Sequence, residues 1–210
     1  MKIAVIGATG MAGSRIAVEA AQRGHTVSGF SRSGVAPSRY GSAGVSKADA
    51  CDADAMRSVS RAHDVIVLAT RPKDGSANSA QAAVSTVLDA ALLSGSRVLV
   101  IGGAASLVVP GGTTLVLDDE RYVPGEWRAI AQASVAQFAA CMPHEADWVY
   151  LSPPAVLRPG ERTGRYRRGI GELLVDARGV SQISAEDLAV AAVDEIEEPR
   201  VAGRHFTVAY

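Results

Sequence analysis

The stretch KIAVIGATGMAG, residues 2–13, decides the fold of this chain. Its first apolar run, Ile3–Ile6, predicts a buried strand, and three glycines with the spacing G-x-x-G-x-x-G follow directly. A helix is expected over Met11–Arg23, with Gly24 in the position that commonly ends helices. Glycines between a strand and a helix remove the Cβ atoms that would keep a pyrophosphate from the helix N-terminus. The residues that we expect to bind a dinucleotide here are Gly7, Thr9, Gly10, Met11 and Gly13.

The rest of the chain alternates short apolar runs with helix-length stretches. Strands are predicted at Thr26–Phe30, near Val45, and at Val65–Ala69, Val98–Ile101, Trp148–Leu151 and Phe206–Val208. Helices are predicted near Ala53–Ala62 and at Ser79–Leu93, Trp127–Cys141 and Ser184–Ile196. This alternation is typical of a Rossmann-type α/β fold, a doubly wound and mostly parallel sheet with helices on both faces. We expect residues 1–210 to form a single NAD(P)-binding domain, with residues 153–183 as a small substrate-side elaboration.

Composition argues against several classes of protein. The formal net charge of −1 gives no electrostatic reason to expect a nucleic acid or an anionic membrane as partner. No apolar run approaches the roughly 18 residues of a membrane span, and MKIAVIGATG lacks the apolar region of a secretory signal. A cytoplasmic protein is therefore expected. Cys51 and Cys141 stand far apart without metal-ligand spacing, so both are expected to be reduced and buried.

The residues after the second predicted strand suggest which dinucleotide binds. Ser31 and Arg32 stand where an NAD-selective protein usually carries an acidic residue for the ribose 2′-hydroxyl. A guanidinium can hold a 2′-phosphate instead, so NADP(H) is preferred over NAD(H) unless Arg32 is simply a solvated side chain. Asp52 follows the third strand. It could contact the adenine amino group, or it could equally cap the helix that starts near Ala53.

Three further strand ends are expected to meet the cofactor, because ligands of open α/β sheets lie beyond the carboxyl ends of the strands. Ala69, Thr70 and Arg71 follow the fourth strand, Gly103 follows the fifth and Pro153 follows the sixth. The first group should run under the ribose and nicotinamide, and Pro153 could form a wall beside the nicotinamide ring.

Four segments resemble a known family along essentially the whole chain: GATGMAG (7–13), IGGAASL (101–107), LSPPAVLRPGERTGRY (151–166) and ISAEDLAVAAVDEIE (183–197). They are similar to the atypical short-chain dehydrogenase/reductases described as NADH-flavin reductases, relatives of biliverdin reductase B and the NmrA-like proteins. The resemblance implies a Rossmann fold with a bound nicotinamide cofactor. It implies the reaction only loosely.

The catalytic residues of the wider superfamily carry over only in part. Ser106 matches the serine after the fifth strand, so it is the candidate catalytic residue, as an orienting hydrogen-bond donor or else merely a polar loop residue. The Tyr-x-x-x-Lys pair is missing, because Tyr122 is followed four residues later by Glu126 and no lysine occurs after Lys73. Without that pair the usual proton relay to a carbonyl cannot be built.

These observations favour an NADPH-dependent reductase that transfers hydride to a flavin- or quinone-like acceptor, with FMN or FAD as a possible substrate. Arg162 and Tyr166 are the candidate substrate residues, for an anionic group and for stacking, although solvated surface roles are as plausible. The alternatives are an NmrA-like redox sensor that binds NADP(H) without catalysis and an epimerase- or dehydratase-like enzyme. We expect a small-molecule acceptor, no metal, and a monomer or homodimer.

Overall fold

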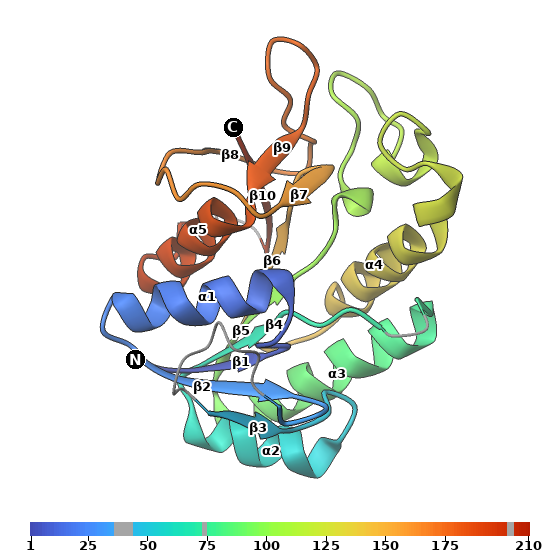
Figure 1. Ribbon diagram of the computed structural model, residues 1–210. Helices are drawn as coiled ribbons and strands as arrows, with labels where there is room; N and C mark the ends of the chain where they lie inside the picture. Colours follow the sequence, from blue (N-terminus) through green and yellow to red (C-terminus); the bar gives the residue numbers. More distant parts are fainter. Residues whose placement is uncertain (36–43, 73–74, 201–203) are drawn as a thin grey trace.

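The computed structural model describes residues 1–35, 44–72, 75–200 and 204–210. Its centre is an eight-stranded sheet (Figure 1) in the order β3-β2-β1-β4-β5-β6-β10-β8, parallel except for β8 at one edge. This is the strand order of the doubly wound fold, extended by β10 and β8. The strands are β1 (Lys2–Ile6), β2 (Thr26–Ser31), β3 (Val45–Lys47), β4 (Val65–Leu68), β5 (Arg97–Ile101), β6 (Trp148–Ser152), β8 (Arg167–Gly169) and β10 (His205–Ala209).

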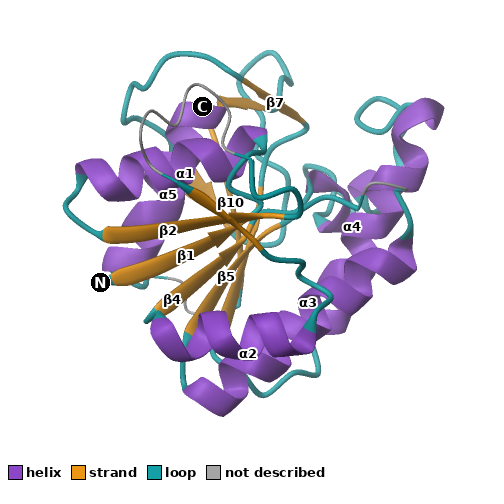
Figure 2. Cartoon of the chain, turned by 60° about the horizontal axis from the view of Figure 1, so that its bottom comes forward, coloured by secondary structure: helices purple, strands orange, loops and turns teal. Residues whose placement is uncertain are grey.

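Helices cover both faces of the sheet (Figure 2). Buried side chains of these helices and of the strands form two separate cores, one on each face. Helices α1 (Met11–Gln22) and α5 (Ala185–Glu197) pack together on one face. On the other face lie α2 (Ala53–Ala62), α3 (Ala77–Ser94) and α4 (Arg128–Cys141). The central strand β4 is buried at every position, which explains why VIVL shows no alternation of apolar and polar residues. No helix of the described parts combines the length and apolar character needed to span a bilayer.

Local sequence signals account for where the helices start. Ser184 accepts a hydrogen bond from the Asp187 backbone at 2.9 Å and thereby caps α5, the helix predicted at Ser184–Ile196. Asp52 caps α2 through the backbone N–H groups of residues 54 and 55. Helix α4 begins one residue later than predicted. Trp127 just before it is about half exposed.

The loops at the carboxyl edge of the sheet contain short elements that the alternation did not predict. Strands β7 (Val156–Arg158) and β9 (Gln182–Ser184) pair with each other, apart from the main sheet. The stretch after β5 forms three single-turn 3-10 helices, η2 (Ala104–Ser106), η3 (Val116–Asp118) and η4 (Gly125–Trp127). A small third core holds this region together, and its buried members are Leu107, Val109, Val116, Val123 and Leu173.

Candidate functional site

The glycine turn divides into two structural glycines and one exposed glycine. Gly7 has a φ of +91°, and a Cβ there would overlap the Ala69 carbonyl. A Cβ on Gly13 would overlap the Gly7 carbonyl, so both positions need glycine for the strand and helix to approach each other. Gly10 is different: it is exposed, has an ordinary φ and precedes α1 without a side-chain cap. Its surroundings leave the first turn of α1 open to an anion.

A cavity of about 1010 Å³ lies directly beyond this turn. Most of the predicted cofactor residues line it: Gly7, Thr9, Gly10, Met11, Ser31, Arg32, Ala69, Thr70 and Arg71. Gly13 and Asp52 are not among its lining residues, since Gly13 is packed under the turn and Asp52 caps α2. For Asp52 the structure therefore favours the capping alternative over a contact with adenine.

The end of the cavity nearest β2 and β3 holds a guanidinium beside a thiol. Arg32 is exposed and makes no ion pair with any residue that the structure describes. Cys51 also lines this cavity and is exposed, so the expectation that it is buried was wrong, whereas Cys141 is buried as expected. Desolvation raises the pKa of the Cys51 thiol; Asp49 adds to the rise and Arg32 opposes it. Arg32 and Cys51 line the same cavity, and the Arg32 guanidinium acts electrostatically on the thiol, so the positive charge of Arg32 lies close to this part of the cavity.

A second cavity of about 820 Å³ adjoins the first, and Met11, Thr70, Arg71 and Gln137 line both. Its walls are mainly apolar, with Trp127, Ile130 and Leu157 among them. Gly103 and Pro153 line this second cavity and not the first. Of the predicted elaboration, residues 153–157 and 179–181 reach it. The two cavities thus form a long cleft, with the glycine turn at one part and an apolar chamber at another.

The ring of Tyr150 lies under the cleft, between the end of β5 and α4, and no sequence pattern indicated its role. Its hydroxyl lies 3.0 Å from the Ser134 carbonyl and 3.1 Å from Gln137 Oε1, so these two acceptors share its single proton. Burial raises the pKa of this phenol, so it stays protonated. A Cβ on Gly102 would overlap the phenol ring, so glycine at 102 makes room for the tyrosine. The rule that buried polar groups need partners could have flagged Gln137, because it sits on the apolar face of a predicted helix.

Ser106 does not line the second cavity, although its neighbours do. Its hydroxyl is 3.3 Å from that of Ser152, whose oxygen is 2.8 Å from His205 Nε2. The flanking residues Ala104 and Ala105 line the cavity instead. In this structure the Ser106 hydroxyl is thus engaged with the end of β6, which is not the placement expected of a donor that orients the acceptor.

His205 gives a testable pH dependence. Burial beside Phe138 and Tyr150 lowers the pKa of its imidazole to about 4, while an unfolded histidine titrates near 6.5. The unfolded state therefore binds a proton before the folded state does, and stability should fall as the pH drops from about 6.5 towards 4. At about 1.4 kcal/mol per pKa unit, the loss should reach roughly 2–3 kcal/mol. Urea unfolding at several pH values would measure it, and a His205→Gln variant should lose this part of the slope; an unchanged slope would contradict the assignment.

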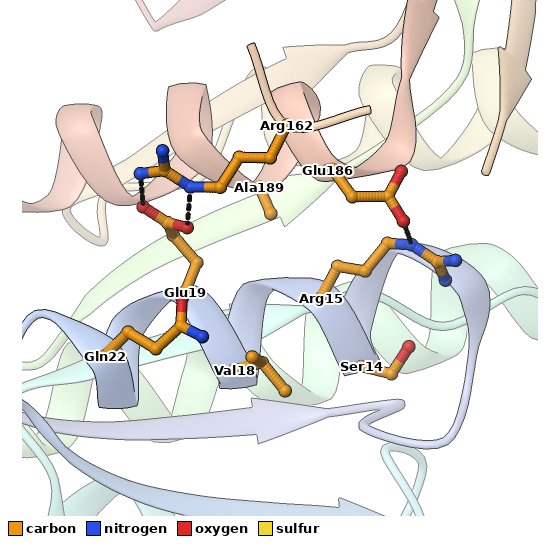
Figure 3. Close-up of a pocket in the computed structure, with 8 residues that line it drawn as sticks. All are labelled: Ser14, Arg15, Val18, Glu19, Gln22, Arg162, Glu186 and Ala189. Atoms are coloured by element: carbon orange, nitrogen blue, oxygen red, sulfur yellow. Dashed lines mark hydrogen bonds and ion pairs between the residues drawn. The ribbon is translucent and has the colours of Figure 1, made fainter. Parts of the chain in front are cut away.

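Arg162 and Tyr166 lie away from both large cavities, so their predicted place in the acceptor pocket does not match the structure. Figure 3 shows Arg162 reaching Glu19 of α1 through two hydrogen bonds, of 2.7 and 2.8 Å. The Tyr166 hydroxyl donates to Asp194 of α5. Both belong to a loop that crosses α1 and α5. There they bind carboxylates of these helices and do not face either of the two large cavities. Arg162 lines instead a separate surface cavity of about 290 Å³.

The fold and the glycine turn define a dinucleotide-binding protein of Rossmann type, and comparisons with known proteins agree. The model of a family described as NAD(P)H-binding matches residues 7–199, so the chain belongs to that family. A solved structure of a candidate exported protein from Burkholderia pseudomallei is 40% identical, with a TM-score of 0.87 and full coverage of both chains.

Two further solved structures carry different names. A candidate epimerase from Bacteroides thetaiotaomicron is 34% identical, with a TM-score of 0.88 over 100% of this chain and 96% of the other. A candidate NADH-flavin reductase from Streptococcus pneumoniae is 26% identical, with a TM-score of 0.86 over 100% of this chain and 99% of the other. The fold and the NAD(P)H-binding family are therefore shown, and the reaction must be argued from the site.

Proposed function

We propose that this protein is an NADPH-dependent reductase of planar, conjugated acceptors such as flavins or quinones. The observation that carries the proposal is the continuity of the two cavities: a phosphate-binding turn adjoins an apolar chamber large enough for a ring system. The described lining residues of the chamber include tryptophan, tyrosine and proline side chains but no lysine. Such a chamber can position a flat acceptor, whereas none of those residues supplies the ammonium that the usual carbonyl reductases of this superfamily require.

The cleft fits the dinucleotide in two ways that follow from the residues. The open first turn of α1, with Gly10 before it, offers backbone N–H groups to the pyrophosphate. Arg32, without a carboxylate partner in the described chain, offers a guanidinium to a 2′-phosphate. When bound, NADPH supplies a hydride, which is two electrons and one proton. The acceptor gains these and one more proton from water, and NADP⁺ is left.

Arg32→Ala is expected to weaken NADPH binding by about 1.5–3 kcal/mol, the contribution of a charge-assisted hydrogen bond, and to leave NADH binding nearly unchanged. Calorimetric titration of both cofactors would measure this difference. Arg61→Ala, at an exposed position of α2, is the matched control for losing one positive charge. Equal NADPH affinity in the Arg32 variant and the wild type would show that Arg32 does not read the phosphate.

The direct test of the proposed function is steady-state oxidation of NADPH with FMN and with a panel of quinones. We expect turnover that saturates with the acceptor. Tight NADPH binding without turnover of any acceptor would favour a non-catalytic sensor instead, while tightly held cofactor that co-purifies and is regenerated would favour an epimerase-like reaction.

A further inference from the structure

Gln137 is a polar side chain buried at the point where the two cavities meet. It is 4% exposed and lies on the inner face of α4. It lines both the first cavity, proposed for the cofactor and called the cofactor cavity, and the second, proposed for the acceptor and called the acceptor cavity. A buried amide costs free energy unless its polar atoms are paired, so a glutamine at a core position of a helix calls for a partner.

The described residues provide a hydrogen-bond partner for the oxygen of the Gln137 amide but not for its nitrogen. The Tyr150 hydroxyl donates to Gln137 Oε1, and the Ser134 carbonyl accepts from the same phenol. The Gln137 Nε2 amino group has no hydrogen-bond partner in the described chain, and it is not one of the buried unpaired atoms. The amino group therefore reaches the cleft with its two N–H donors.

We infer that Gln137 is the hydrogen-bond donor that binds the acceptor's carbonyl oxygen and stabilises the negative charge that develops on it during reduction. This inference rests on the proposed reductase function and names the group that takes the place of the missing Tyr-Lys pair. A neutral amide cannot deliver a proton, so it assists acceptors that spread charge over a ring and take their proton from water. Tyr150 is a positioning residue in this arrangement, because it fixes the amide without facing the acceptor itself.

The arrangement suits charge stabilisation because little has to reorganise. Gln137 lies on the rigid helix α4, its oxygen is anchored by a protonated phenol, and its surroundings are largely apolar. A fixed donor in a site of low polarity stabilises developing charge more strongly than a mobile donor in water. Loss of one such donor typically lowers kcat by about 100-fold to 1000-fold.

The kinetic test compares Gln137→Met, which keeps the length and removes the donors, with Gln132→Met on the exposed side of the same helix. We expect kcat for quinone reduction to fall about 100-fold or more in the Gln137 variant, with NADPH affinity by calorimetry unchanged. The Gln132 variant should behave as the wild type. A Gln137 variant that folds, binds NADPH and keeps its kcat would overturn the inference while leaving the reductase function standing.

A binding test does not depend on turnover. Para-nitrophenol changes its absorbance on ionisation, so a donor site that favours an oxyanion should bind the phenolate and lower the apparent pKa of the bound probe. We expect this shift with the protein–NADP⁺ complex of the wild type and of Gln132→Met, and its loss in Gln137→Met. An equal shift in all three proteins would exclude Gln137 as the donor. If the wild type lowered the pKa of the bound probe but had no reductase activity, both the proposed reaction and the role of Gln137 towards an acceptor would be wrong. Gln137 would then be only an anion-binding amide.

Discussion

Gly10→Val is expected to abolish dinucleotide binding while the fold survives. Gly10 is exposed before α1, and its nearest neighbour for an added Cβ is the Gly7 carbonyl at 3.2 Å, a tight but tolerable contact. A valine would place two methyl groups over the first turn of α1, where the pyrophosphate must approach the backbone N–H groups. Calorimetry with NADPH and circular dichroism on the same preparation would measure the two properties.

Two other glycines make the test specific. Gly44→Val, at an open and exposed position before β3, should leave both binding and fold unchanged. Gly13→Val should damage the fold itself, because its side chain would overlap the Gly7 carbonyl. If Gly10→Val bound NADPH as the wild type does, the phosphate site would have to lie elsewhere in the cleft.

Simple ketones and aldehydes are expected to be far poorer substrates than flavins and quinones. A ketone develops an alkoxide that needs a proton in the transition state, and general acid catalysis typically contributes about 10²–10⁴-fold. Conjugated acceptors delocalise the incoming charge, so positioning and one fixed donor suffice for them. A panel assay with NADPH at saturating concentration should therefore show a gap of about that size in kcat/KM between the two classes.

Tyr122 is the residue that could act as a general acid towards ketones and so reduce this difference in kcat/KM, since it lines the acceptor cavity. With no lysine four residues later, we expect Tyr122→Phe to have little effect on quinone reduction. Ser106→Ala should have at most a moderate effect, because its hydroxyl is directed to Ser152. If the protein reduced ketones efficiently and Tyr122→Phe abolished that activity, the prediction would be wrong and the protein would be a conventional carbonyl reductase.

The sequence predicted the scaffold well because the scaffold depends on local and repetitive signals. Apolar runs marked the strands, and Ser184 and Gly24 marked helix ends. The glycine turn could be placed because a phosphate site needs glycine at fixed distances from a strand and a helix.

The acceptor side could not be predicted in the same way, because it depends on contacts between distant segments. Trp127 lies half exposed in the chamber wall, and the sequence alone does not distinguish such a position from one in the core, since an apolar residue suits either environment. Arg162 and Tyr166 were expected to bind substrate, but carboxylates 143 and 28 residues away in the chain hold them. Gln137 was missed because its importance arises from Tyr150, 13 residues further along the chain on another element.

The close fit between Gly102 and Tyr150 links two sequence positions that can be compared in other chains. The space under the cleft cannot hold both a side chain at 102 and a tyrosine ring at 150, because even a Cβ at 102 would overlap the ring. An engineer who wishes to introduce a serine at 102 would have to shrink residue 150 in the same step, and would thereby release the amide of Gln137. The two positions should therefore change as a pair. A relative with a larger residue at 102 but a small one at 150 would be expected to have a differently polarised chamber and a different range of acceptors.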